Sequence, residues 1–321
     1  MANYPTNRRH AIAAAAAALL WRSPSPAAAQ MARVDLLHDP ASRLGSRGDA
    51  GYTPPTELKT VADIYRRMTL AIGVNGSGPY PFVVDTGANQ SVISSELCAR
   101  LGLPAGAPAP LNGVAGIRIA PTTKARLVIG KRVLEDQVLS VLPTEGIGGP
   151  GMLGLDCVGE AALTLDFANR DLRIDMGRSN WRDPDAVAVK ASRRDGQLTL
   201  VNVSLAGAPL LAFVDSGAQS TIGNMALREV ALTRSPKSQW TQTRIISSTG
   251  QSIVAEMAYL SSLRVGKLIV PDWPVAFADL HTFQMWNMID KPAILLGVDI
   301  LSRFQYVCLD FARDEVRFRL A

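Results

Sequence analysis

Cysteine and histidine are both scarce in this sequence, with three of each among 321 residues. The cysteines Cys98, Cys157 and Cys308 show no CxxC spacing, so neither a zinc site nor a redox motif is indicated. A single disulfide is possible, but we expect three buried thiols instead. A Ser-His-Asp or Cys-His site would depend on His281 alone, and no nucleophile motif accompanies it. We therefore expect neither a metal nor a cofactor.

Long apolar runs are also absent, and none reaches the roughly 20 residues of a membrane-spanning helix. The first 29 residues combine a basic start, a ten-residue apolar segment from Ala11 to Leu20 and a small-residue site at 27–29. This pattern predicts an export signal, and Arg8-Arg9 favours the twin-arginine route. A disordered alanine-rich tail is the alternative. The expected location is periplasmic or secreted.

The rest of the chain has little excess charge of either sign once residues 1–29 are set aside. The segment holds Arg8, Arg9 and Arg22 and no acidic residue, so without it the formal net charge falls from +5 to +2. A protein so close to neutral has no electrostatic basis for binding nucleic acid or an acidic membrane. The composition, 47% hydrophobic and 19% charged, is that of a globular protein.

What the sequence does contain is an internal repeat. Residues 68–94, MTLAIGVNGSGPYPFVVDTGANQSVIS, match residues 198–223, LTLVNVSLAGAPLLAFVDSGAQSTIG. Three further pairs follow in the same order: 112–133 with 247–270, 151–158 with 294–301, and 163–174 with 307–318. The elements read as short strands with frequent turns, and helix is expected only in brief stretches such as 94–101, 155–161 and 298–303.

The repeat predicts an all-β protein made of two similar barrel lobes related by a pseudo-twofold axis. The boundaries follow from the repeat and from the Pro-, Gly- and charge-rich stretches between its copies. We assign residues 1–29 to the export signal, 30–60 to a linker or pro-segment, 61–178 to an N-terminal lobe, 179–197 to the connection and 198–321 to a C-terminal lobe.

Each copy ends an apolar strand with an aspartate, Asp85 or Asp215, followed by a hydroxyl residue and glycine. The glycine allows a sharp turn and a close neighbour. If the two aspartates meet on the pseudo-axis, they cannot both ionise readily, and one proton is shared between them. The ionised partner can then take a proton from water, while the protonated partner donates to a carbonyl oxygen.

These motifs resemble those of the aspartic protease clan, whose signature is Asp-Thr/Ser-Gly followed later by two apolar residues and glycine. The second half of the signature stands at 152–154, Met-Leu-Gly, and at 295–297, Leu-Leu-Gly. Ala88 and Ala218 after the turn glycines resemble retroviral proteases more than pepsin-like enzymes. The chain is similar to a single-chain fusion of two retroviral-protease-like halves, as in exported bacterial aspartyl proteases.

The resemblance implies an active site between the lobes and a working pH less acidic than that of pepsin. It implies catalytic roles for Asp85 and Asp215, and flap tips near Gly116 and Gly250 that close over an extended peptide. Asp156 and Asp299 are expected to cap the short helices that follow the second signature. Supporting roles are implied for Thr86, Gly87, Ser216, Gly217, Gly154 and Gly297.

An endopeptidase acting on exported proteins is the leading function, and the mature chain is expected to work as a monomer. The rival is a catalytically silent member of the same fold that binds peptides or another protein. A two-carboxylate glycosidase is disfavoured because such sites do not use paired symmetric turns. Residues 280–292 lengthen the second copy, and four of their side chains could line a substrate pocket or pack between the lobes: Phe283, Met285, Trp286 and Met288.

Overall fold

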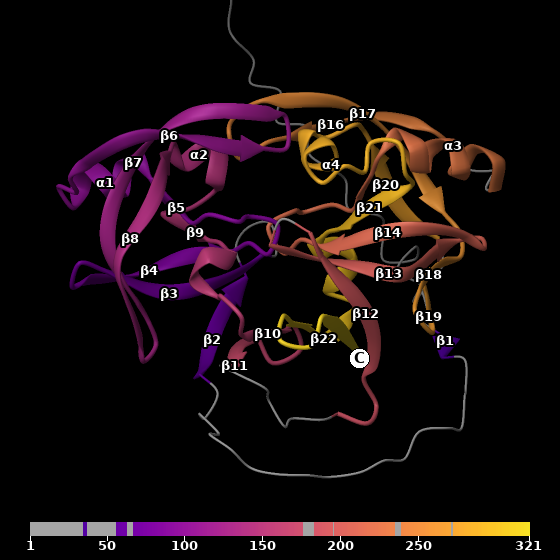
Figure 1. Cartoon of the computed structure of the whole chain (residues 1–321), viewed down its shortest axis with the longest axis horizontal. Coiled ribbons are helices and arrows are strands. Elements are labelled where there is room, and N and C mark those ends of the chain that lie inside the picture. Colours follow the sequence, from indigo (N-terminus) through magenta and orange to yellow (C-terminus); the bar gives the residue numbers. More distant parts are fainter. Residues whose placement is uncertain are drawn as a thin grey trace, which may run out of the picture. The chain divides into compact units, whose positions relative to one another are not determined.

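The computed structural model describes residues 35–36, 56–62, 67–175, 183–194, 196–234, 239–270 and 272–321. The expected export signal and most of the expected linker lie outside these residues. The described part of the chain consists mainly of short β-strands, which confirms the predicted all-β class (Figure 1). None of its helices has the length and apolar character needed to cross a membrane.

The first lobe is a curled sheet closed around an apolar core. Its long strands alternate between buried and exposed side chains, as in β7, where Leu127 and Ile129 are fully buried and Lys124 is exposed. Helix α1 is short because Ser94 caps its first turn and Gly102, at a φ of 59°, ends it. The elements are β3 (Met68–Val74), β4 (Ser77–Val84), β5 (Val92–Ser94), α1 (Ser95–Arg100), β6 (Ala105–Gly113), β7 (Gly116–Ile129), β8 (Arg132–Leu142), α2 (Thr144–Ile147), β9 (Gly151–Leu153) and the 3-10 helix η1 (Leu155–Cys157).

The second lobe repeats this order and its strand pairing. Strand β4 runs parallel to β9 as β14 does to β21, and β5 pairs with β8 and β9 as β15 does with β20 and β21. The elements are β13 (Gln197–Leu205), β14 (Ala208–Val214), β15 (Ile222–Gly223), α3 (Met225–Arg234), β16 (Thr241–Ile246), β17 (Ser252–Leu260), β18 (Leu263–Val265), β19 (Leu268–Val270), β20 (Trp273–Phe277), α4 (His281–Met285), β21 (Ala293–Leu296) and α5 (Val298–Leu301).

A six-stranded antiparallel sheet joins the two lobes (Figure 1). Its central pair, β10 and β22, places Thr164 directly opposite Cys308. These two residues hold the same position in the repeated sequence, so a pseudo-twofold axis passes between them. The strands, in spatial order, are β2 (Thr56–Ala62), β11 (Asp171–Asp175), β10 (Ala162–Asp166), β22 (Phe304–Asp310), β23 (Glu315–Leu320) and β12 (Val187–Arg194).

Several elements extend beyond what the sequence indicated. Strand β2 begins at Thr56, inside the segment assigned to a linker, and β12 lies inside the assigned connection. A two-residue strand, β1 (Asp35–Leu36), pairs with β19. Helix α3, of ten residues, was not among the helices expected. All three cysteines are free, and Cys157 and Cys308 are buried as expected, whereas Cys98 is partly exposed.

Candidate active site

The two aspartate turns lie at the ends of buried strands β4 and β14, which hold them rigidly. The Oδ1 atom of Asp85 accepts hydrogen bonds from the backbone N–H groups of Gly87 at 2.8 Å and Ala88 at 3.1 Å. In the second copy, Oδ1 of Asp215 accepts the equivalent pair of hydrogen bonds at 2.9 and 3.0 Å. Each turn therefore uses one carboxylate oxygen to stabilise itself and leaves the other available to a ligand or to the partner carboxyl.

Thr86 and Ser216 lock the turns together across the lobe interface. The Thr86 hydroxyl donates to the carbonyl oxygen of Val214 at 2.8 Å and accepts the N–H of Ser216 at 3.0 Å. The Ser216 hydroxyl donates to the carbonyl oxygen of Val84 at 2.7 Å and accepts the N–H of Thr86 at 3.1 Å. Both side chains are fully buried. This reciprocal set of four bonds fixes the spacing of the two aspartates.

The apolar-apolar-Gly segments support the turns from behind. The backbone N–H of Asp85 donates to the carbonyl oxygen of Leu153, and that of Asp215 to Leu296, both at 3.0 Å. A Cβ atom on Gly154 would lie 2.8 Å from the carbonyl oxygen of Ala88. Such a contact is closer than packed side chains allow, so glycine is required at this crossing, and Gly297 stands at the equivalent one.

The turn glycines face the opposite carboxyl groups. A Cβ atom on Gly87 would overlap the carboxyl group of Asp215, and one on Gly217 would overlap that of Asp85. The glycines thus allow each aspartate to approach the other's turn. Both carboxyl groups also line the same cavity, so the structure brings the two predicted residues together.

The two carboxyl groups differ in their affinity for protons. Burial, followed by the negative charge of Asp85, raises the pKa of Asp215 well above its ordinary value. Burial also raises the pKa of Asp85, but the hydrogen bond from Asp215, the N–H of Gly87 and the positive charge of Arg67 oppose that rise. The two groups therefore titrate as a pair that retains one proton over a range of pH, and the larger rise in pKa is that of Asp215.

The prediction that Asp156 and Asp299 cap short helices is wrong. Neither helix N-terminus has a side-chain cap, because both aspartates lie inside the first turn. Asp156 instead accepts the N–H and hydroxyl of Ser91 at 3.0 and 2.6 Å, and Asp299 accepts those of Thr221 at 3.0 and 2.8 Å. A hydroxyl residue stands six positions after each active-site aspartate, and this repeated signal could have revealed the contact.

The two hairpins expected to act as flaps are present. Gly116 begins β7 at a φ of 132°, and Gly250 lies in the turn between β16 and β17 at a φ of 83°. The hairpin ends contact one another, since Nη1 of Arg118 donates to the carbonyl oxygen of Thr249 at 3.1 Å. Neither glycine lines the cavity below; their neighbours Asn112, Gly113, Val114, Ser248 and Thr249 do.

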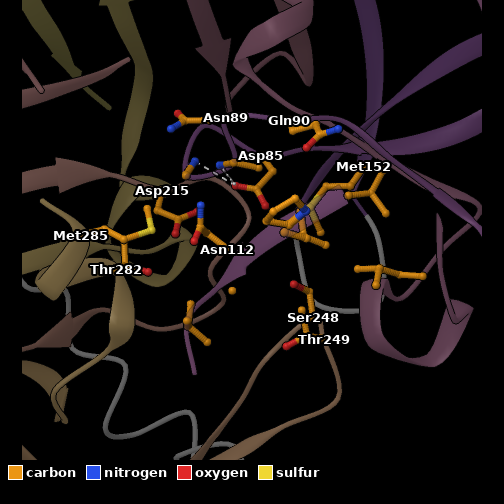
Figure 2. A pocket seen from close by; sticks show the side chains of 18 of the residues that line it. Asp85, Asn89, Gln90, Asn112, Met152, Asp215, Ser248, Thr249, Thr282 and Met285 are labelled. Carbon is orange, nitrogen blue, oxygen red and sulfur yellow. Dashed lines mark hydrogen bonds between the residues drawn. The ribbon is translucent and has the colours of Figure 1, made fainter. Parts of the chain in front are cut away.

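A cavity of about 180 Å³ lies beneath the hairpins and includes both aspartates (Figure 2). Apolar residues of the first lobe also line it. Met152 belongs to the second half of the signature, and three others were not singled out from the sequence: Val92, Leu111 and Leu142. These residues look like ordinary core positions in the sequence, and only the fold places them beside the aspartates.

The lengthened segment of the second copy also reaches this cavity. Thr282, Met285 and Trp286 line it, whereas Phe283 and Met288 are fully buried in the core of the second lobe. The pocket alternative thus applies to Met285 and Trp286, whereas Phe283 and Met288 pack within the second lobe rather than between the lobes. Within the residues that the structure describes, no group of His, Cys, Asp and Glu is arranged to hold a metal ion.

Comparison with protein-family models identifies a family for this chain. The family model described as aspartyl protease matches residues 70–157 and residues 201–300. The matched stretches fall one in each lobe and together cover more than half of the chain, which confirms the resemblance to two retropepsin-like repeats. No curated protein matches the chain.

Proposed function

Because this chain belongs to the aspartyl protease family, we propose that it is an endopeptidase that hydrolyses peptide bonds of exported proteins. The observation that carries the proposal is the pair of aspartate carboxyl groups that lie against one another's turns. Asp85 and Asp215 line one cavity, and their spacing is fixed by Thr86 and Ser216.

The chemistry follows from this arrangement. A water molecule between the carboxyl groups loses a proton to ionised Asp85 while its oxygen attacks the peptide carbonyl carbon. Protonated Asp215 donates its proton to the carbonyl oxygen, which produces a neutral tetrahedral diol. Asp85 then gives its newly acquired proton to the amide nitrogen, while Asp215 takes back a proton from one hydroxyl of the diol. The C–N bond breaks to give an amine and a carboxylic acid, and the pair returns to its starting protonation state. No covalent enzyme intermediate is required.

The two hairpins supply the substrate's backbone contacts. An extended peptide lying between the aspartates and the hairpin ends would pair with them as an added strand. Since the hairpin ends contact one another in the described structure, entry of a peptide requires them to separate. Both aspartates come from one chain, so we expect the monomer to be active.

The test is cleavage of a diverse unfolded peptide mixture by the purified chain, from about pH 3 to about pH 8, beside Asp85→Asn and Asp215→Asn. We expect cleavage by the natural sequence, inhibition by a peptide bearing a tetrahedral-alcohol mimic, and at least a ~10³-fold loss in either variant. Activity that survives in both variants would refute the assignment. Activity confined to a dimer fraction in light scattering would refute the monomer.

A folded protein that cleaves nothing at any pH would favour the rival function, a silent peptide-binding module. Calorimetry should then show that the protein still binds the alcohol-containing peptide, although it cleaves no peptide. Export is a separate proposal that rests on residues 1–29. Replacement of Arg8 and Arg9 by lysine should abolish export of the protein if the twin-arginine route is used, and leave it unchanged if another route is used.

A further inference from the structure

Each lobe has an apolar residue pair at the same place in its strands, but only the pair of the first lobe lines the cavity. Val92 pairs with Met152 in the first lobe, and Ile222 pairs with Leu295 at the same place in the second. Val92 and Met152 line the cavity, whereas Ile222 and Leu295 do not. The surface that lies open to a ligand on the first-lobe side is therefore covered on the second-lobe side.

The cover is the plug segment, which we define as residues 281–288. It belongs to the connection between β20 and β21, residues 278–292, which is longer than its counterpart in the first lobe, residues 143–150. Phe283, Trp286 and Met288 are buried in one cluster with Ile222 and Leu295. The Trp286 ring packs on Phe213 with a centroid separation of 4.2 Å, so the segment is firmly seated.

The plug segment also reaches the cavity and a flap. Met285 and Met152 lie on opposite sides of the two aspartates (Figure 2), and both line the cavity. The backbone N–H of His281 donates to the carbonyl oxygen of Val114, at the end of the first flap hairpin, at 2.8 Å. The segment thus bounds the second-lobe side of the cleft and contacts the hairpin above it.

Trp286 offers a hydrogen-bond donor at this boundary. Its side chain is 3% exposed and lines the cavity, and its Nε1 atom has no hydrogen-bond partner among the residues that the structure describes.

We propose that the plug segment makes the cleft one-sided. The first-lobe side accepts a large apolar side chain, and the second-lobe side accepts a small residue. This specificity rests on the proposed function, because it takes the ligand to be an extended peptide. A substrate would therefore carry a bulky apolar residue on one side of the scissile bond and Gly, Ala or Ser on the other.

The chain offers a matched pair of variants, Met152→Ala and Met285→Ala, which remove the same atoms from opposite sides of the cleft. Cut sites in a peptide mixture should show the one-sided pattern for the natural sequence. In Met285→Ala, the ratio of kcat/KM for peptides with Leu at the small position to kcat/KM for peptides with Ala there should rise at least about tenfold. Met152→Ala should change the preference only at the large position. Met152→Val replaces it if the alanine variant does not fold.

Equal tolerance of large residues on both sides, or the same shift from both variants, would overturn the proposal. A binding experiment tests the one-sided cleft separately from the proposed peptidase activity, because it requires no cleavage. Two peptides with a non-cleavable alcohol in place of the scissile bond, flanked by Phe and Ala in the two orders, are titrated into Asp215→Asn. A preference of about tenfold for one order, abolished by adding Met285→Ala, supports the one-sided cleft even without cleavage. Equal binding, or none, overturns it.

Discussion

Gly87 lies directly against the carboxyl group of Asp215, with no room for a Cβ atom between them. Gly87→Ala should therefore push the two aspartates apart and reduce kcat/KM at least ~10²-fold, because displacement of about 1 Å has this effect on catalysis. Gly149→Ala is the control, since its Cβ would lie at an ordinary 3.7 Å from the nearest atom, the carbonyl oxygen of Pro81. Similar kinetics for the two variants would contradict the prediction.

The four hydrogen bonds that Thr86 and Ser216 make between the lobes should contribute measurably to stability. Thr86→Ala removes a buried hydroxyl that serves both Val214 and Ser216, so it leaves two backbone groups without partners. We expect the free energy of unfolding to fall by about 1–3 kcal/mol per unsatisfied buried group, as measured by urea denaturation. Thr233→Ala, at an exposed position of α3, should change it by less than ~0.5 kcal/mol. An equal effect at both positions would show that the lock is not stabilising.

The free energy of unfolding should fall as the pH rises, because Asp215 loses its proton more readily in the unfolded chain than in the folded protein. Its folded-state pKa is raised well above the ordinary value of 3.8, so the folded state favours the protonated form. That contribution is fully present below about pH 3.8 and is lost as the pH rises toward the folded-state pKa. Asp215→Asn does not titrate, so its melting temperature should match that of the natural protein near pH 3 and exceed it near pH 7. A constant difference across this range would contradict the assignment.

The acid limb of the activity profile should depend on Arg67. This buried arginine lowers the pKa of Asp85, and the second copy has Gln197 at the same position. Arg67→Gln should raise the pKa of Asp85 and move the acid limb of kcat/KM to higher pH. Arg244→Gln makes the same charge change at an exposed position and should leave the limb in place. An unshifted limb in Arg67→Gln would argue against this electrostatic coupling.

The buried cysteines should resist alkylation. Burial raises the pKa of the Cys157 thiol to about 12 and that of Cys308 to about 11, so neither forms the reactive thiolate near neutral pH. Iodoacetamide should label Cys98 alone in the folded protein, as read by mass spectrometry, and all three in denaturant. Rapid labelling of Cys157 under native conditions would contradict this environment.

The repeat made the fold predictable. Because the pattern of strand, turn and Asp-Thr/Ser-Gly occurs twice, each copy supported the interpretation of the other as one of two similar all-β lobes. The positions of Asp85 and Asp215 beside one another also follow from the pseudo-axis. Strand β12 was missed because its first half, residues 187–190, pairs with the distant strand β23, although its second half forms a local hairpin with β13.

The cavity lining was not predictable in the same way. Val92 and Met152 have the character of core residues, and only long-range packing decides that a space remains beside them. Met285 and Trp286 were named as candidates, but the sequence could not divide the segment between cavity and core. Trp286 belongs to both groups, because it lines the cavity while its ring packs on Phe213, more than 70 positions away in the sequence.

The pairing of Thr164 with Cys308, at the centre of the sheet that joins the lobes, has a consequence for each half of the chain taken alone. A fragment that ended after β11 would leave the edge of β10 without its partner, since β22 comes from the other half. An unpaired edge favours association with another strand. Here the missing strand is related to β10 by a twofold rotation, so a second copy of the fragment has the right geometry to take its place, with Thr164 opposite Thr164. The half-chain is thus shaped as the subunit of a symmetric homodimer.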